Sequence, residues 1–445
     1  MNVEAVAGHA SISSFQYWTA IVLFLATYGI VLTERINRAI VAVLGAGLMV
    51  LLGVLTQDLA LKGIDFNTIG LLLGMMIIVV ITKESGVFQY VAIKSAKAVH
   101  ANPIGVLAVF SIVTAVFSAL LDNVTTVLLI TPVILLITRE LGVKPYPYLF
   151  SSILASNIGG SATLIGDPPN IMIGSAAGLS FNDFIINVAP ISAVIMVLTM
   201  APLLLIWRKD LVASEHNKER IMKLNEKEAI KDPLLLKQAM FTLALVILGF
   251  TVGHGYHIQP ATSALIGAAL LLLLNNYKHH HDEQEKRVHA SIAEAEWVTL
   301  CFFGGLFVVV YGLEHVGAIN QLADMMLEFT AGNFETTVFT VLWGSAIISA
   351  LVDNIPFVAT MIPMIQNMST TFNPEQISIL WWALALGACL GGNGSLIGAS
   401  ANLVVAGFAS RAGHTISFLK FMKLAFPLML ASIAITHLYI EWRYM

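Results

Sequence analysis

Two acidic residues in apolar surroundings are the first groups in this sequence that could do chemistry. Asp122 lies in SALLDN and Asp353 in SALVDN, and each is followed by an asparagine, Asn123 or Asn354. An aspartate at membrane depth costs about 2.5 to 3.5 kcal/mol on insertion scales, so each of the two needs compensation. Each could cap a helix by accepting hydrogen bonds from backbone N–H groups two or three residues on. Each could also bind a coupling ion or carry a proton, and the two roles are compatible.

Four polar segments interrupt the apolar stretches and hold the other candidate ligands. In a membrane, backbone that leaves the helix is tolerated only where it is buried in protein or lines a wet cavity. Free N–H groups at the start of a half-helix attract anions, and the carbonyls that end the preceding half-helix attract cations. Secondary transporters build their midplane sites in this way. The four segments are LDNVTT (121–126), SNIGGSATLIGDPPN (156–170), VDNIPF (352–357) and GGNGSLIGASAN (391–402).

These segments predict one ion- or substrate-binding site at the membrane midplane. The paired glycines in two of them either allow close helix packing or present backbone to a ligand. Asp167 has Ala399 as its counterpart, so it is either a turn residue before Pro168 or an ion ligand present in one half only. The candidate residues are Asp122, Asn123, Thr125, Asn157, Gly159, Gly160, Thr163, Asp167, Asn170, Asp353, Asn354, Gly391, Gly392, Asn393, Ser395 and Asn402.

The composition is that of a polytopic membrane protein. Of the 445 residues, 57% are hydrophobic and 11% are charged, against roughly 25% charged residues in soluble domains. The net charge of -4 leaves no basic surface for nucleic acid. The two cysteines exclude a disulfide framework and a cysteine-based metal site, and we expect no metal centre. The first 18 residues contain no Lys or Arg, so we expect no cleavable signal and a retained first span.

The chain contains an internal repeat. We predict an all-α fold of two units, inverted relative to each other, with five membrane crossings each. SALLDN and SALVDN, GGSATLIG and GGNGSLIG, and the segments around Gly74 and Gly304 recur in the same order at nearly one offset. The first unit covers 1–207, with a re-entrant hairpin at 103–140, whose second arm we expect to be too short to span, and a broken helix at 146–180. A charged cytoplasmic linker covers 208–237. The second unit covers 238–445, with a hairpin at 334–371 and a broken helix at 376–410.

The distribution of basic residues supports the inverted topology independently. If both termini lie outside the cell and the linker lies inside, only Lys62 and Arg443 of the 23 Lys and Arg residues fall outside. We therefore predict a multi-pass protein of the cell membrane with a cytoplasmic linker.

Other polar features carry less chemistry. Glu84 and Glu314 match between the repeats, but both lie at predicted span ends, where solvation is the simpler role. The tract from His279 to Glu283 is expected to be part of a solvated loop. The chain has no GxxxxGK phosphate loop, so ATP would have to come from a separate ATPase partner.

The four motifs resemble the melanosomal P protein family and its prokaryotic relatives in the ion-transporter superfamily. That superfamily also holds arsenical-pump permeases, sodium/proton antiporters and citrate-transporter-like carriers. The resemblance covers the chain from about residue 66 onward. It implies a homodimer in which hairpins and broken helices move against a scaffold as an elevator. In the carboxylate carriers of this superfamily, the sequence at the hairpin tips resembles Ser-Asn-Thr. This chain has Asp122-Asn123-Val124 and Asp353-Asn354-Ile355 at the matching positions. The acidic residue in place of Ser disfavours a dicarboxylate substrate.

We therefore expect a secondary active ion transporter in the lipid bilayer. It would move a small inorganic ion, a small anion or a metalloid such as arsenite, coupled to H⁺ or Na⁺, and it would need no cofactor. Two aspartates with no intramembrane Lys or Arg nearby favour H⁺ or Na⁺ as one of the ions. The alternatives are a Na⁺/H⁺ antiporter, an anion channel with the same fold and an intramembrane aspartyl enzyme, which would need two carboxylates that share a proton.

Overall fold

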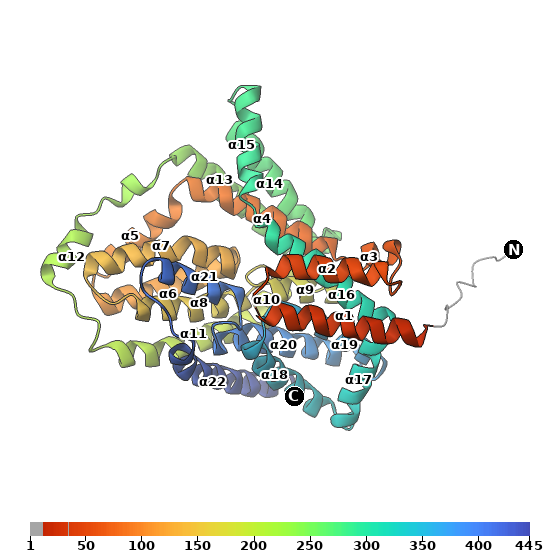
Figure 1. Ribbon diagram of the computed structural model, residues 1–445. Coiled ribbons are helices and arrows are strands. Elements are labelled where there is room, and N and C mark those ends of the chain that lie inside the picture. Colours follow the sequence, from red (N-terminus) through yellow and green to blue (C-terminus); the bar gives the residue numbers. More distant parts are fainter. Residues whose placement is uncertain (1–11, 34) are drawn as a thin grey trace.

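The computed structural model describes residues 12–33 and 35–445, and every regular element within them is a helix (Figure 1). Residues 1–11, which bear on the expected absence of a signal peptide, lie outside the described part. The elements of the first half are α1 (Ser14–Thr33), α2 (Arg38–Leu51), α3 (Gln57–Lys62), α4 (Phe66–Glu84), α5 (Val87–Ala98), α6 (Pro103–Leu120), α7 (Asn123–Leu141), α8 (Tyr146–Ser161), α9 (Pro168–Ala177), α10 (Phe181–Asn187) and α11 (Ala189–Trp207).

The second half repeats this order after a linker that itself contains short helices. The linker holds α12 (Glu215–Met222) and η1 (Glu226–Ala229). The elements that follow are α13 (Pro233–Val252), η2 (Gly253–Tyr256), α14 (Pro260–Asn276), α15 (His281–Ala293), α16 (Trp297–His315), α17 (Ala318–Phe329), α18 (Phe334–Leu351), α19 (Asn354–Asn367), η3 (Met368–Thr370), α20 (Pro374–Gly391), η4 (Gly392–Gly394), α21 (Ser400–Arg411) and α22 (Phe418–Tyr444).

Matching polar residues start matching helices in the two halves. The side chain of Asn102 accepts hydrogen bonds at the start of α6, and Asn333 does so at the start of α18. Asp122 and Asp353 cap the second hairpin arms, α7 and α19, in the same way. Because such caps satisfy N–H groups that have no partner inside the helix, the repeated polar residues set the repeated helix boundaries.

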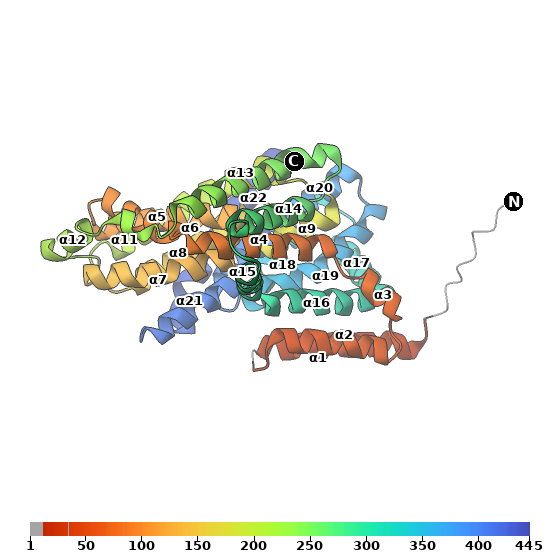
Figure 2. The same ribbon diagram turned by 90° about the horizontal axis from the view of Figure 1, so that it is seen from above.

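The two halves interlock through their early helices. Helix α2 of the first half packs along α16 of the second, and α14 of the second packs along α4 of the first. Figure 2 shows α2 lying alongside α16. Glycines allow both contacts, since a Cβ at Gly74 would collide with the backbone of Ala264 and a Cβ at Gly305 with that of Ala42. Each half therefore covers a helix face of the other.

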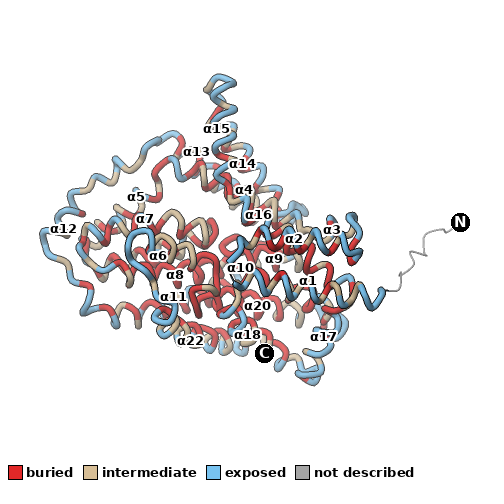
Figure 3. Tube along the Cα trace, in the orientation of Figure 1, coloured by how far each residue is buried: buried red, intermediate tan, exposed pale blue. Residues whose placement is uncertain are grey.

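The broken helices form the centre of the molecule. Residues 147–161 of α8 are all buried. In the apolar part of α20, 83% of the residues are buried, whereas in that of α1 only 11% are buried. Figure 3 shows buried residues concentrated around α8 and α20. Within residues 12–33 and 35–445, ten helices are long and apolar enough to cross a membrane, which makes the chain a multi-pass membrane protein.

The second hairpin arms differ from the expectation that both are too short to span. Helix α7 has 19 residues and continues through Pro132, because a proline inside a membrane helix can be accommodated by neighbouring groups. Only α19, with 14 residues, is short. The ten candidate spans include α6, α7 and α18 but exclude the shorter α2 and α14. For the first hairpin, re-entrance stays a prediction that rests on the charge distribution and no longer on length.

The charged linker is more ordered than a plain loop and ends earlier than expected, because α13 already begins at Pro233. It is attached to α5, since Lys97 Nζ lies 2.6 Å from Glu226 Oε2 and donates to the Leu224 carbonyl at 3.0 Å. The hydrogen bond from Lys97 holds the pKa of Glu226 below its usual value. At the start of α5, Gly86 has a φ of 82° and lies against the Ala229 carbonyl.

We predict that Gly86→Ala destabilises the protein more than Gly317→Ala. Both glycines occupy the same place in the repeat and have a positive φ, so each alanine adds about 1 to 2 kcal/mol of left-handed strain. Only the Cβ at residue 86 would also collide with the linker, since space around Gly317 is open. Thermal unfolding of the two purified variants in detergent measures the difference, and equal midpoints would contradict the attachment of the linker at this point.

Candidate functional site

Two asparagine side chains hold the unwound backbone at the centre of the molecule. Asn170, in the first turn of α9, donates to the carbonyls of Ser161 at 3.0 Å and Thr163 at 2.9 Å. Asn402, in the first turn of α21, donates to the carbonyls of Gly392 and Ser395, each at 2.8 Å. These carbonyls lie where α8 and α20 end, and their bonds within a helix are lost there. The two asparagines therefore satisfy the broken helices from within the protein.

A third asparagine joins the two halves. Asn157 on α8 donates from Nδ2 to Oδ1 of Asn393 at 3.0 Å and to Oδ1 of Asn402 at 2.9 Å. The Nδ2 atom of Asn123, at the tip of the first hairpin, lies 3.4 Å from Oδ1 of Asn157. All four side chains are buried. Four of the six candidate asparagines, from both repeats, thus form one contiguous network.

Small residues and hydroxyl groups fit each hairpin against its broken helix. Thr163 Oγ1 donates to the Ala119 carbonyl at 2.6 Å, and its counterpart Ser395 donates to the Ala350 carbonyl. Each broken helix has a pair of glycines near its break. A Cβ on the first glycine of either pair would collide with backbone of the hairpin, and a Cβ on the second would lie against the backbone carbonyl six residues later in the unwound segment. The glycine pairs are Gly159-Gly160 and Gly391-Gly392, and they serve close packing in this structure.

The two hairpin aspartates have different surroundings. Asp122 is buried and caps α7, with Oδ1 accepting from the N–H of Thr125 at 2.7 Å. Asp353 caps α19 through Ile355, and its Oδ2 also lies 3.2 Å from Nη1 of Arg38. This ion pair corrects the expectation that neither aspartate has an Arg or Lys nearby. The charge distribution had placed Arg38 in an inner loop.

Asp167 is a buried carboxylate without a charged partner among the described residues. It is 1% exposed. The Nδ2 atom of Asn354, at the tip of the second hairpin, lies 3.5 Å from both carboxylate oxygens. Asp167 precedes α9 but makes no side-chain cap to it. Its backbone carbonyl accepts from the N–H groups of Asn170 and Ile171, and the two prolines that follow Asp167 have no N–H for its carboxylate. Whether Asp167 is a turn residue or an ion ligand stays a prediction.

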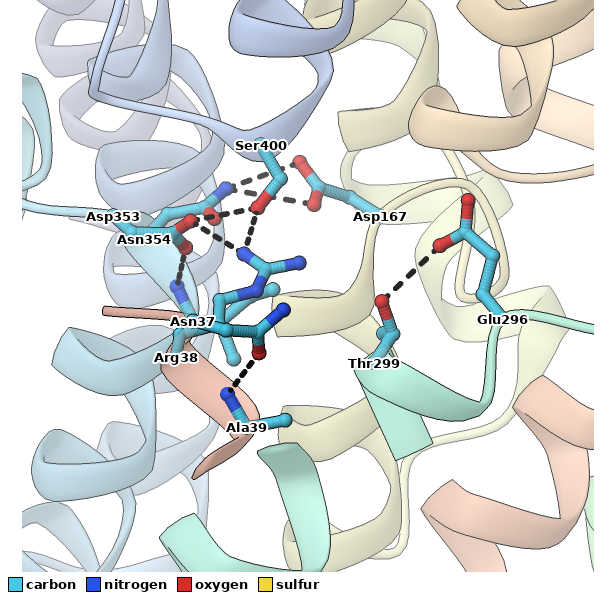
Figure 4. A network of polar contacts seen from close by, with 10 residues as sticks. Asn37, Arg38, Ala39, Asp167, Glu296, Thr299, Asp353, Asn354 and Ser400 are labelled. Carbon is cyan, nitrogen blue, oxygen red and sulfur yellow. Dashed lines mark hydrogen bonds and ion pairs between the residues drawn. The ribbon is translucent and has the colours of Figure 1, made fainter. Parts of the chain in front are cut away.

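A cavity of about 300 Å³ opens between the two hairpin tips. It is lined by Val124 from the first tip, Asp353 from the second, and Arg38 and Ser400. Glu296, one residue before α16, also lines it and accepts from Oγ1 of Thr299 at 3.1 Å. Figure 4 shows Arg38, Asp353 and Ser400 in contact, with Asp167 facing Asn354 and with Glu296 on the other side.

Arg38, Glu296 and Ser400 were not among the predicted site residues. Arg38 and Glu296 lie in charged segments next to span ends, where solvation is the usual reading, and no sequence signal connects them with Asp353. Ser400 aligns with the first proline of the Pro168-Pro169 pair, so the repeat gave no reason to select it.

The other polar features lie apart from the site. Glu84 is exposed, and Glu314 lines a separate cavity with Lys62. His279 contacts Glu283 and Arg287 beside the projecting helix α15.

We predict that Asn157→Ala destabilises the protein markedly. The change removes the amide that donates to Oδ1 of Asn393 and Oδ1 of Asn402. Each buried polar group left unpaired lowers the free energy of unfolding by about 1 to 3 kcal/mol. The matched control is Ser151→Ala on the same helix, because the buried Ser151 hydroxyl has no hydrogen-bond partner in the described structure. Unfolding midpoints in detergent compare the two, and a loss for Ser151→Ala as large as for Asn157→Ala would contradict the network.

Comparison with known proteins places the chain among membrane transporters. It is 40% identical to the 46 kDa membrane protein of Mycobacterium leprae over 96% of this chain and 98% of that protein. An uncharacterized transporter of Mycobacterium tuberculosis matches with the same identity and coverage. The human P protein is 32% identical over 96% of this chain, which spans 61% of the P protein.

The fold and the family agree with this placement. The crystal structure of the YdaH transporter of Alcanivorax borkumensis superposes with a TM-score of 0.55 at 13% identity, covering 96% of each chain. This similarity concerns the fold alone. The sequence profile described as citrate transporter matches residues 28–387. The chain is therefore a transporter that belongs to the citrate transporter family.

Proposed function

We propose that this protein is a secondary active ion transporter whose coupling ion, H⁺ or Na⁺, binds at the acidic groups around the hairpin tips. The observation that carries this proposal is the isolated Asp167 carboxylate. A buried carboxylate is stable only when it is protonated, paired or bound to a cation. Asn354 offers a distant amide and no positive charge, so a bound proton or Na⁺ would neutralise this carboxylate.

Neighbouring groups supply further ligands for a cation. The Oδ1 atom of Asn123 is buried and has no hydrogen-bond partner among the described residues. Its backbone N–H donates to the Gly166 carbonyl, which places Asn123 next to the segment that carries Asp167. Amide and carboxylate oxygens are the ligands that hard cations such as Na⁺ prefer. A proton would neutralise the same carboxylate by forming one O–H bond and would need no further ligands.

The transported species is proposed to be a small inorganic ion, a small anion or a metalloid such as arsenite. Helix α21 begins at the site without a side-chain cap, so its first N–H groups and positive dipole end can face an anion or a neutral hydroxide. Helix α9 begins with two prolines and offers no N–H group at its first two positions. The runner-up is a Na⁺/H⁺ antiporter, which the excess of carboxylates over arginine at the site favours. A carrier for citrate, the substrate in the family's name, is less well supported, because the hairpin tips are acidic.

The proposal includes an elevator motion in a homodimer, as the resemblance implies. The hairpins and broken helices would move as one body, since the asparagine network holds them together. The early helices of each half would form the scaffold. The termini are proposed to lie outside the cell membrane and the linker in the cytoplasm, with a separate ATPase as a possible partner.

Two other classes fit the geometry less well. An intramembrane aspartyl enzyme needs two carboxylates that share a proton, whereas Asp353 is paired with Arg38. An anion channel with this fold would carry a current that reverses at the Nernst potential of one ion and ignores H⁺ and Na⁺ gradients.

We predict that an external Na⁺ pulse changes the internal pH of proteoliposomes that contain the wild-type protein. A trapped pH dye reports the change, a K⁺ pulse is the ion control, and Asp122→Asn should lose the response, because Asp122 is a buried carboxylate at a hairpin tip. If wild-type protein shows no response to Na⁺, exchange of Na⁺ for H⁺ is wrong. Arsenite, chloride and carboxylates driven by a pH gradient are then tested as substrates.

We predict that Asp167→Asn abolishes coupled flux while the protein stays folded. The amide keeps the shape of the side chain but removes the charge that the ion would balance. The matched control is Asp324→Asn on α17, because that carboxylate is exposed and does not line the cavity between the hairpin tips. Initial flux in proteoliposomes and elution in size-exclusion chromatography are measured for both variants. Wild-type flux in Asp167→Asn would refute a coupling role for this carboxylate.

A further inference from the structure

One side chain connects the early helices with the tip of the second hairpin. Arg38 begins α2, and its Nη1 atom contacts both Asp353 Oδ2, at 3.2 Å, and Ser400 Oγ. Ser400 in turn donates to the same carboxylate oxygen at 2.7 Å. The guanidinium lies 4.9 Å from the centre of the Phe302 ring on α16. Arg38 is thus held on the early helices by an aromatic face and reaches across to a carboxylate on another element.

Helix α1 makes a second polar contact with the same hairpin arm. Tyr28 Oη donates to the Pro356 carbonyl at 2.7 Å and lies 3.0 Å from Thr360 Oγ1. The tip of the second hairpin is therefore fastened to both α1 and α2. These contacts join the two bodies that an elevator motion would have to separate.

The tip of the first hairpin has no such fastening. Among the described residues, the hydrogen bonds of the Asp122 carboxylate stay within its own hairpin, and no side chain of α1, α2, α13 or α14 forms a hydrogen bond or ion pair with segment 118–126. The charged group on the adjoining cavity wall is Glu296, an acid. Of the two equivalent aspartates, only Asp353 has a positively charged partner among the described residues.

We propose that Arg38 is a tethered cation that neutralises Asp353 while no ion is bound there, and that it must leave Asp353 before the second hairpin can move. This inference rests on the proposed ion-coupled transport. Arg38 and an incoming ion cannot both occupy Oδ2 of Asp353, which opens into the cavity between the tips. The pair is partly exposed, with 27% of the Arg38 side chain and 16% of the Asp353 side chain accessible, so an ion from the cavity can reach it.

The effect of this competition on the apparent affinity for the coupling ion can be calculated. When the competent form of a site is only a fraction of the total, its apparent affinity falls by that fraction. If Arg38 occupies Asp353 in about nine molecules of ten, its removal raises the apparent affinity for the coupling ion about tenfold. The Arg38 side chain is then a positioning residue for transport, because it acts through Asp353 and is not itself carried.

The test measures the concentration of coupling ion that gives half-maximal flux in proteoliposomes. Na⁺ at constant pH is the probe, or H⁺ if the wild-type protein responds to H⁺ alone. Arg38→Gln should lower the half-saturating concentration about tenfold. The matched control is Arg35→Gln, an exposed arginine three residues earlier whose side chain makes no ion pair with any residue that the structure describes, and it should leave that concentration unchanged. An unchanged or higher value in folded Arg38→Gln protein would overturn the proposal.

A double-mutant cycle separates competition from a merely structural role. In the Asp353→Asn background the carboxylate is absent, so adding Arg38→Gln should have no further effect on the half-saturating concentration. A tenfold shift that persists in this background would show that Arg38 acts elsewhere and would contradict the proposal. If Asp353→Asn carries no flux, the concentration of Na⁺ or H⁺ that gives half of the ion-dependent shift in melting temperature replaces flux.

Arg38→Lys covers the case in which Arg38→Gln does not fold. Lysine keeps the charge but carries it on a compact, strongly hydrated and flexible ammonium group that stacks less well on Phe302, so a smaller shift in the same direction is expected. Aggregation of both variants would show that Arg38 is needed for folding and would overturn the competition. Absence of coupled flux in the wild-type protein would instead refute the proposed function, so the two failures are distinguishable.

Discussion

The structure depends on how the broken helices satisfy their backbone in an environment without water. Two helices that stop in the middle of a membrane protein leave carbonyls that no further turn can bond. Asn170 and Asn402 solve this problem in the same way in both halves, each from the first turn of the next half-helix. With these carbonyls satisfied from within, the two breaks need no water from the membrane side, and the aspartates at the hairpin tips satisfy the starts of α7 and α19 in the same manner.

The repeated sequence predicted much of this arrangement. The Asp-Asn pairs, the glycine pairs and the Asn residues identified where the helices break, because helix capping and unwinding depend on local residue types. Because these residue types recur in the second half, its helices follow one another in nearly the same order as in the first. The prediction of a charged linker also located the boundary between the halves, although α13 begins inside it at Pro233.

What the sequence could not predict depends on contacts between distant residues. Arg38 and Asp353 are 315 residues apart, and no periodicity or motif connects them. The rule that arginines near span ends are solvated is correct on average, but it says nothing of a side chain that reaches inward. The length of α7 was also misjudged, because this helix continues through Pro132 and has 19 residues. The asymmetry between Asp167 and Ala399, in contrast, was visible in the alignment of the repeats.

The crossed packing of the early helices has a consequence for how such a chain could have arisen. Helix α2 covers α16, and α4 is covered by α14, so each half leaves open the face that the other half closes. A protein made of one half alone would expose that face and would need a second copy to cover it. A duplicated gene would therefore have joined two chains that already depended on each other, and later divergence between the copies could place a charge such as Arg38 on one side only.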